Sequence, residues 1–332
     1  MNPSLTIIIP VYNASLYLEQ CLDSLLVDNG FTGQVVCVND GSTDDSLEIL
    51  RHYEKLYENL EIFSQPNRGQ AVARNVGLKH AMGDYVIYLD SDDYYLPNAI
   101  STICSIIIQN PDVDVFYTDC AITEEQKRMY TIKSLTPIKM PLQSYYEYEY
   151  SQYRTIPQGC ICGMFYKREF LLQNHIQMAP GLRYEDALFV IEVFLQKGTC
   201  LAVHLDHPYY HYRNNREGAT TTEFSISHYA DRREIAHKAY QKIIEMDLLT
   251  PARKKRLFEL YEENFLQAGQ NKLNMSLTKF FDKEDMVIMN KCAEDERQKK
   301  ICKLAKFSPN ILSLYMAEKL PVLARKCVNH LF

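Results

Sequence analysis

The N-terminal part of the chain alternates between apolar runs and polar loops in a strand–helix rhythm. Apolar runs over residues 5–10, 34–39, 60–64 and 85–89 each end in a short polar loop. Apolar residues then return at helical spacing, as at Leu18, Leu22 and Leu25, and we predict helices after residue 15 and over 44–57 and 70–82. Unbroken apolar strands such as 35–38 are typical of strands buried on both faces. This order predicts an α/β fold with a mostly parallel, Rossmann-like sheet.

In such sheets a ligand binds outside the carboxyl ends of the strands, which here are followed by loops 10–13, 40–44, 65–69 and 90–93. The last loop reads Asp90-Ser91-Asp92-Asp93. Three neighbouring carboxylates repel one another unless a cation lies between them. Mg²⁺ or Mn²⁺ binds carboxylate oxygens together with water and substrate phosphates. We therefore predict a divalent-metal and diphosphate site here; the alternative is that the aspartates cap a helix beginning near Pro97.

Two further residues of these loops are candidates for binding the same ligand. Asp40 leaves a buried strand directly into a glycine turn, where its carboxylate can accept a hydrogen bond from a donor such as a base N–H. One of the next polar residues, Ser42, Thr43 or Asp44, is expected to cap the following helix. Arg74 lies on the helix predicted over 70–82 and can present its charge to a diphosphate. Arg68 competes for that role, and an exposed Arg74 without function is the simpler alternative.

An acidic pair opens a second motif in Arg183-Tyr-Glu-Asp-Ala-Leu-Phe189, ahead of an apolar helix. A carboxylate within hydrogen-bond reach of an acceptor hydroxyl can remove its proton as that oxygen attacks. Asp186 is our candidate for this base. Two acids placed favourably at a helix N-terminus are the alternative.

Net charge, cysteine distribution and the length of the apolar runs bear on the partners, redox state and location of the protein. The net charge of -6 gives no basic face for a phosphate backbone, so we expect no nucleic-acid partner. The ten cysteines are scattered among apolar residues, and we expect reduced thiols, with no zinc site at Cys160 and Cys162. No apolar run reaches the ~20 residues of a membrane span, so we expect a cytoplasmic protein.

The pattern changes to long helical stretches from about residue 224. We place a boundary near residue 223, which separates a catalytic domain over 1–223 from a helical C-terminal region over 224–332. Segment 311–332 mixes apolar residues with basic ones, so it either lies on an anionic inner-membrane surface or packs on the protein with a solvated basic face.

Four motifs in order resemble the family 2 inverting glycosyltransferases of the GT-A fold. They are Ile9-Pro-Val-Tyr-Asn13, Asn39-Asp-Gly-Ser-Thr-Asp44, Asn67-Arg-Gly69 with Ala73-Arg-Asn-Val-Gly77, and Asp90-Ser-Asp-Asp93, within a similarity over about 4–222. The resemblance implies a nucleotide-sugar half over 1–115 and an acceptor half over 116–223. It implies that Pro10 and Tyr12 line the nucleobase and ribose pocket and that Asp40 accepts a hydrogen bond from the base. Gly69, Arg74 and Ser91 join the donor-binding set.

The same resemblance makes Asp90 and Asp92 the two acids of a D-x-D motif, with Asp92 in direct contact with Mn²⁺ or Mg²⁺. It gives Asp186 the role of base and Glu185 that of orienting the acceptor or its loop. Tyr209-Tyr-His-Tyr-Arg213 is similar to the family's aromatic-Tyr-Arg segment, so Arg213 is expected to neutralise the leaving diphosphate. Gly218 stands where a serine is usual in the following element. His211 is either an additional metal ligand or a packed residue.

The predicted function is therefore transfer of a sugar, with inversion, from a nucleotide-sugar donor, by family habit a UDP-sugar. By analogy, the acceptor is a glycan or lipid-linked glycan of a bacterial surface polysaccharide. A nucleotidyltransferase or NAD-dependent dehydrogenase would need a different phosphate-binding loop, and neither G-x-G-x-x-G nor G-x-x-x-x-G-K-[ST] occurs. A non-catalytic sugar- or nucleotide-binding module on the same fold is the other alternative.

Overall fold

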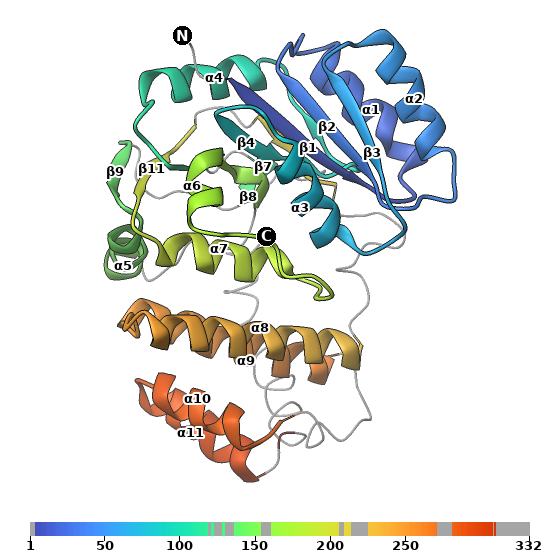
Figure 1. The fold of residues 1–332 in the computed structure, drawn as a ribbon. Helices are drawn as coiled ribbons and strands as arrows, with labels where there is room; N and C mark the ends of the chain where they lie inside the picture. The colour runs from blue at the N-terminus through green and yellow to red at the C-terminus, as the bar shows by residue number, and fades with distance from the viewer. Residues whose placement is uncertain are drawn as a thin grey trace. The chain divides into compact units, whose positions relative to one another are not determined.

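A computed structural model describes residues 4–118, 121–122, 128–129, 136–153, 161–205, 209–213, 225–270, 281–307 and 309. Its contacts divide the chain into two compact units (Figure 1). Unit 1 comprises residues 1–145, 158–181 and 196–215, and unit 2 comprises residues 146–157, 182–195 and 216–332. Helix α5 (Leu142–Tyr153) divides between them.

Unit 1 is built on an eight-stranded sheet in the order β3-β2-β1-β4-β10-β6-β11-β9. Strands β3, β2, β1 and β4 are parallel, as are β6 and β11, whereas β10 and β9 run antiparallel to their neighbours. The predicted α/β class with a mostly parallel sheet is thus confirmed. The strand bounds are β1 (Leu5–Val11), β2 (Gln34–Asn39), β3 (Leu60–Ser64), β4 (Tyr85–Tyr88), β6 (Val115–Thr118), β9 (Ile138–Pro141), β10 (Met164–Lys167) and β11 (Thr199–Val203).

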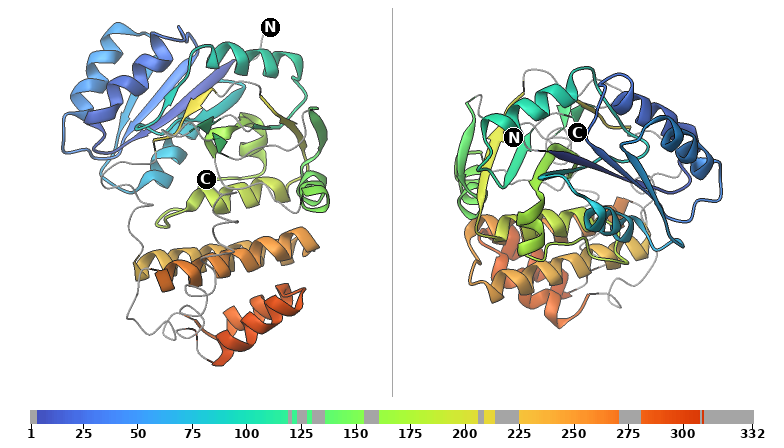
Figure 2. Two further views of the ribbon diagram at one scale, coloured as in Figure 1. Left: turned by 180° about the vertical axis from the view of Figure 1, so that it is seen from behind. Right: turned by 45° about the horizontal axis from the view of Figure 1, so that its top comes forward.

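Helices cover both faces of this sheet. Figures 1 and 2 show α1 (Ser15–Leu26) and α2 (Ser46–Leu56) on one side of the first strands and α3 (Gln70–His80) on the other. Every residue of β1 is buried as a result, which is why its sequence is almost entirely apolar, with Thr6 as its polar residue. Gly77 of α3 allows close approach to β1, since a Cβ there would lie 2.2 Å from Cγ2 of Ile8. The helices predicted over 44–57 and 70–82 are confirmed, each slightly shorter than expected.

Unit 1 also contains α4 (Ala99–Gln109), α6 (Arg168–Gln173), a 3₁₀ turn η1 (Ile161–Gly163) and a small second sheet. The small sheet has the order β5-β12-β7-β8, with β5 (Tyr94–Tyr95), β12 (Tyr210–His211), β7 (Ala121–Ile122) and β8 (Arg128–Met129). Strand β5 directly follows the Asp90–Asp93 loop, and β12 pairs antiparallel with it. This pairing brings residues 210–213 to that loop from more than a hundred positions along the chain.

Unit 2 is helical, as expected for the C-terminal region. It contains α7 (Glu185–Leu195), α8 (Ile226–Glu245), α9 (Pro251–Gln270), α10 (Lys283–Cys292) and α11 (Glu296–Phe307). Helix α8 packs on α7 and α9, α10 packs on α9, and α11 packs on α10. The predicted boundary near residue 223 lies outside the described residues and stays a prediction. The units nevertheless interleave along the chain, because α7 packs with the helices of unit 2.

Two further expectations concern the cysteines and the membrane. The seven cysteines within the described ranges are all free, and all but Cys104 are buried, which agrees with the expected reduced core thiols. Cys160 lies outside those ranges, as do Gly218 and segment 311–332. None of the helices the structure describes combines the length and the apolar character that crossing a membrane requires.

Candidate functional site

Asp40 organises the loop between β3 and α3. Its Oδ1 accepts hydrogen bonds from Gln65 Nε2 (2.6 Å) and the Arg68 backbone N–H (2.9 Å), and its Oδ2 accepts one from the Gly69 backbone N–H (2.8 Å). The side chain is almost fully buried, at 2% exposure. A carboxylate has about four acceptor positions, so one remains for a ligand. The predicted contact with a base N–H stays a prediction, and holding the loop is a role that the sequence did not reveal.

The loops after β1 and β2 are joined by hydrogen bonds between short polar side chains. The Asn13 backbone N–H donates to Ser42 Oγ (3.1 Å), and the Thr43 backbone N–H donates to Asn13 Oδ1 (2.8 Å). Asp44 accepts hydrogen bonds from the Ser15 backbone N–H (3.0 Å) and the Ser46 backbone N–H (3.1 Å). Burial raises the pKa of Asp44, but the hydrogen bonds from Ser46 and Ser15 outweigh it and lower the pKa to about 2. Asp44 therefore bonds the first residue of α2, but the N-cap residue is Asp45, so none of the three predicted residues occupies the cap position.

Pro10 and Tyr12 lie at the carboxyl end of β1. Pro10 is buried within the strand, whereas half of the Tyr12 side chain is exposed. An exposed aromatic ring beside a polar strand edge offers a surface on which a planar base can stack. Both residues thus lie at the carboxyl edge of the sheet, and their predicted roles in binding the base and the ribose stay predictions.

Asp90, in the loop after β4, and Arg74, on α3, form a partly buried ion pair. Arg74 Nη2 lies 2.5 Å from Asp90 Oδ1, and the two side chains are 4% and 20% exposed. Gln70 Nε2 also donates to Asp90 Oδ1 (3.2 Å), and Asn75 of the same helix bonds the Met178 carbonyl (2.8 Å). Arg74, not the exposed Arg68, therefore carries its charge to the aspartate loop. The alternative of a solvent-exposed Arg74 is wrong, because the residue is 3% exposed; its contact with a diphosphate stays a prediction.

Asp93 is the structural anchor of the same loop. Its Oδ2 lies 2.5 Å from the Tyr210 hydroxyl, and its Oδ1 accepts the Arg213 backbone N–H (2.8 Å). Burial, followed by the negative charges of Asp92 and Asp90, raises the pKa of Asp93 well above its ordinary value. The aspartates do not cap the next helix, because α4 begins after Asn98, which is its N-cap residue. The helix-cap alternative is therefore wrong.

Arg213 supports the aspartate loop from behind. Its Nε donates to the Asp92 carbonyl (2.9 Å) and its Nη2 to Gln20 Oε1 (2.7 Å). Its guanidinium carbon lies 4.8 Å from the ring centroid of Tyr17. The predicted contact with a leaving diphosphate stays a prediction, since the side chain already bonds protein groups. His211 stacks on Tyr94 with ring centroids 4.4 Å apart and is 6% exposed, as expected of a packed residue.

The residues of this loop suit a hard divalent cation. Among the described residues, oxygen or sulfur atoms of Asp90, Asp93 and Cys162 lie within 4.8 Å of one another. Both oxygens of Asp93 already accept hydrogen bonds, and Asp90 Oδ2 faces Cys162 Sγ at 3.8 Å. Asp90 Oδ2 and the half-buried Asp92 are the carboxylates that would hold the ion. One or two carboxylates, completed by water and phosphates, are what Mg²⁺ or Mn²⁺ needs. The predicted Asp90 and Asp92 pair fits, although Asp92 is not part of that three-residue group.

The acidic pair Glu185 and Asp186 belongs to unit 2, where it forms the first turn of α7. Glu185 is buried and Asp186 is half-buried, with its Oδ1 accepting the Ala187 backbone N–H (2.9 Å). Their predicted roles in catalysis stay predictions. Favourable placement of two acids at a helix start remains the competing reading.

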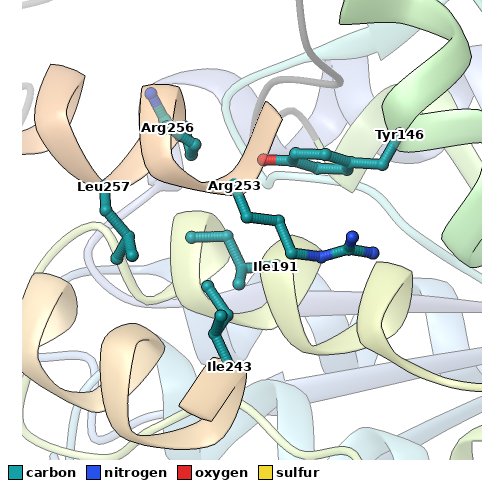
Figure 3. Close-up of a pocket in the computed structure, with 6 residues that line it drawn as sticks. All are labelled: Tyr146, Ile191, Ile243, Arg253, Arg256 and Leu257. Atoms are coloured by element: carbon teal, nitrogen blue, oxygen red, sulfur yellow. The ribbon is translucent and has the colours of Figure 1, made fainter. Parts of the chain in front are cut away.

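A cavity in unit 2 is too small to bind a sugar. Tyr146, Ile191, Ile243, Arg253, Arg256 and Leu257 line it (Figure 3). Its volume of about 10 Å³ is roughly what one water molecule needs. Arg253 is held there by Glu147 Oε1 and the Phe194 carbonyl, each at 3.1 Å. We read this cavity as a packing feature of the helical unit.

Comparison with known proteins finds similarity to glycosyltransferases. The sequence profile described as Glycosyl transferase family 2 matches residues 6–173. The uncharacterized glycosyltransferase YibD of Escherichia coli is 29% identical over 201 residues, which cover 57% of this chain and 55% of YibD. The chain thus spans about half the length of this curated relative.

Two solved structures share the fold. S. aureus TarS, crystallised with UDP-GlcNAc, superimposes with a TM-score of 0.72 at 22% identity, covering 95% of this chain and 90% of that chain. The mannosyltransferase PcManGT of Pyrobaculum calidifontis, in complex with GDP-Man and Mn²⁺, gives a TM-score of 0.56 at 16% identity, covering 100% and 88%. These likenesses confirm the predicted fold class.

Proposed function

Because this chain belongs to glycosyl transferase family 2, we propose that it transfers a sugar from a nucleotide-sugar donor to a hydroxyl of a glycan or lipid-linked glycan. A UDP-sugar carrying a hexose or N-acetylhexosamine is the first candidate for the donor, supported by the UDP-GlcNAc complex of TarS. The Arg74–Asp90 ion pair at the carboxyl edge of the sheet is the observation that carries the proposal. It sets a cation and an acidic loop where a sugar diphosphate needs both.

The donor is bound by residues of unit 1. Tyr12 stacks on the base, Asp40 keeps the 65–69 loop in place and accepts a base N–H, and Arg74 faces the diphosphate. Asp92 and Asp90 would hold a Mn²⁺ or Mg²⁺ ion, which would supply positive charge to the leaving nucleoside diphosphate. The Mn²⁺ in the PcManGT complex supports this part of the proposal.

Proton removal from the acceptor is assigned to Asp186. Its carboxylate takes the proton of the attacking hydroxyl while the sugar–phosphate bond breaks on the opposite face of the anomeric carbon. A single displacement of this kind inverts the anomeric configuration. Glu185, at the start of the same helix, orients the acceptor or the loop that holds it.

Peripheral contact with an anionic membrane is proposed for the C-terminal helices. Exposed basic residues gather on α11: Lys299, Lys300, Lys303 and Lys306. A basic helix face is attracted to anionic lipids. Vesicle flotation tests this part: binding to phosphatidylglycerol vesicles, but not to phosphatidylcholine vesicles, supports it, and equal recovery with both contradicts it.

The proposed activity is tested by nucleoside diphosphate release. The purified chain is incubated with UDP-, GDP- and dTDP-sugars, in Mn²⁺ and in EDTA, with Asp186→Asn beside the wild type. Metal-dependent release from one donor that Asp186→Asn abolishes supports the transferase. Silence across the panel, with no thermal shift by any nucleotide, favours the non-catalytic binding module.

A further inference from the structure

The segment that precedes the acidic pair is attached to helix α8. Arg183 Nη1 lies 2.8 Å from Asp231 Oδ2 and donates to Ser227 Oγ at 3.0 Å. The Arg183 backbone N–H also points to Asp231 Oδ2, at 3.4 Å. Asp231 is the less exposed partner, at 17% against 43% for Arg183. Asp231 therefore fixes both the main chain and the side chain two residues before Glu185.

Tyr184 adds a second attachment and an unusual backbone conformation. Its φ of 61° lies in the left-handed region, which a bulky aromatic residue adopts rarely. The guanidinium of Arg232 lies 4.3 Å from the centroid of its ring, and the His228 ring lies at 6.1 Å. Strained residues persist where the surroundings hold them, and they gather at functional sites. Here the surroundings are Arg232 and His228, one turn apart on α8.

Helix α8 also holds the far end of α7. Lys242 Nζ lies 2.8 Å from Glu192 Oε1, so ion pairs join the two helices near both ends of α7. The start of α8 is itself fixed by a capping box, in which Ser225 and His228 bond each other reciprocally. The platform that supports the acidic pair is thus well defined before any substrate is bound.

We propose that α8 positions the Glu185–Asp186 pair for proton removal, with Asp231 and Arg232 as positioning residues. The helical C-terminal region then takes part in catalysis. This inference rests on the proposed function, since it treats Asp186 as the base. It predicts that disturbing the Arg183–Asp231 pair affects turnover while donor binding, which relies on unit 1, is unchanged.

The test compares Asp231→Asn with Glu234→Gln, a matched loss of one carboxylate on the same helix. Glu234 is 45% exposed at its side chain and pairs with Lys238 at i,i+4. Hydrogen exchange of the 182–187 amides reports the anchoring without any substrate. Nucleoside diphosphate release from the donor the wild type uses gives kcat and KM. We expect Asp231→Asn to speed exchange of this segment and to lower kcat about 10- to 100-fold at an unchanged donor KM. Glu234→Gln should change neither quantity.

A charge swap separates positioning from general damage. Arg183→Glu combined with Asp231→Arg should recover part of the kcat that each single variant loses. The inference would be overturned if the wild type is active and Asp231→Asn shows the same hydrogen exchange and the same kcat as Glu234→Gln. Absence of turnover by the wild type would instead overturn the proposed function, and with it the role assigned to the pair, whereas exchange would still report the anchoring.

Discussion

Replacing Asp40 by asparagine tests whether this residue builds the donor site or only contacts the ligand. The carboxylate accepts three hydrogen bonds from the 65–69 loop at 2.6–2.9 Å and is 2% exposed. An asparagine side chain has one carbonyl oxygen, so its NH₂ group takes the place of the other carboxylate oxygen. The hydrogen bonds accepted by that oxygen are lost, and the amide N–H faces a backbone N–H instead. A hydrogen bond to a charged group contributes about 1.5–3 kcal/mol.

We therefore expect the Asp40→Asn variant to lose about 2–3 kcal/mol of unfolding free energy without any ligand present. That corresponds to a fall of roughly 5–10 °C in the melting temperature for a unit of this size. Thermal unfolding followed by circular dichroism measures it. UDP titration in Mn²⁺ should then show weaker binding, because the loop that carries Gly69 is no longer held.

The control is Asp45→Asn, which removes the same charge from an exposed position that makes no side-chain cap bond. It should melt with the wild type and bind UDP normally. An Asp40→Asn protein that melts with the wild type, yet binds UDP weakly, would refute the loop-holding role and leave Asp40 as a ligand contact alone.

Three further variants probe the packing and the charges around the site. Gly77→Ala should lower the unfolding free energy by about 1–3 kcal/mol in urea, because its Cβ would lie 2.2 Å from the Ile8 side chain. Asp44→Asn tests a pH effect: the folded pKa of about 2 lies below the ordinary 3.8, so Asp44 stabilises the fold above pH 4 and this contribution disappears as the pH falls toward 2. The variant should be less stable than the wild type at pH 7, and unfolding curves of the two proteins should converge at acid pH; a constant gap would contradict it. Arg74→Met should destabilise the apo protein by about 2–3 kcal/mol. This is less than the full cost of breaking a buried pair, because Asp90 is 20% exposed. Mn²⁺ should raise the melting temperature of this variant more than that of the wild type.

The local pattern of the sequence predicted the elements around the site. Strands such as 35–38 are continuous apolar runs because helices cover both faces of the sheet, and that signal is independent of distant residues. The strand-end loops followed directly from it, because parallel strands bring their carboxyl ends to one edge. Arg74 could be identified as a candidate because it lies on the helix that leaves one of these loops.

Contacts between distant segments could not be predicted from the sequence. Asp93 bonds Tyr210, 117 positions away, through the pairing of β5 with β12, and two-residue strands give no periodic signal. Two of the three bonds of Asp40 come from the backbone N–H groups of Arg68 and Gly69, so they depend on the backbone path of this loop. The grouping of α7 with the C-terminal helices likewise involves contacts between distant residues, such as Arg183 and Asp231, which are 48 positions apart.

UDP titration calorimetry tests the central claim, a metal-dependent nucleotide-sugar site at the carboxyl edge of the sheet. The wild type and Asp92→Ala are each titrated with UDP, first in Mn²⁺ and then in EDTA. The account predicts that the wild type binds UDP in Mn²⁺. It also predicts that UDP affinity falls strongly when EDTA replaces Mn²⁺ and when Asp92 is replaced by alanine. Equal UDP affinity in Mn²⁺ and EDTA, unchanged by Asp92→Ala, would contradict it.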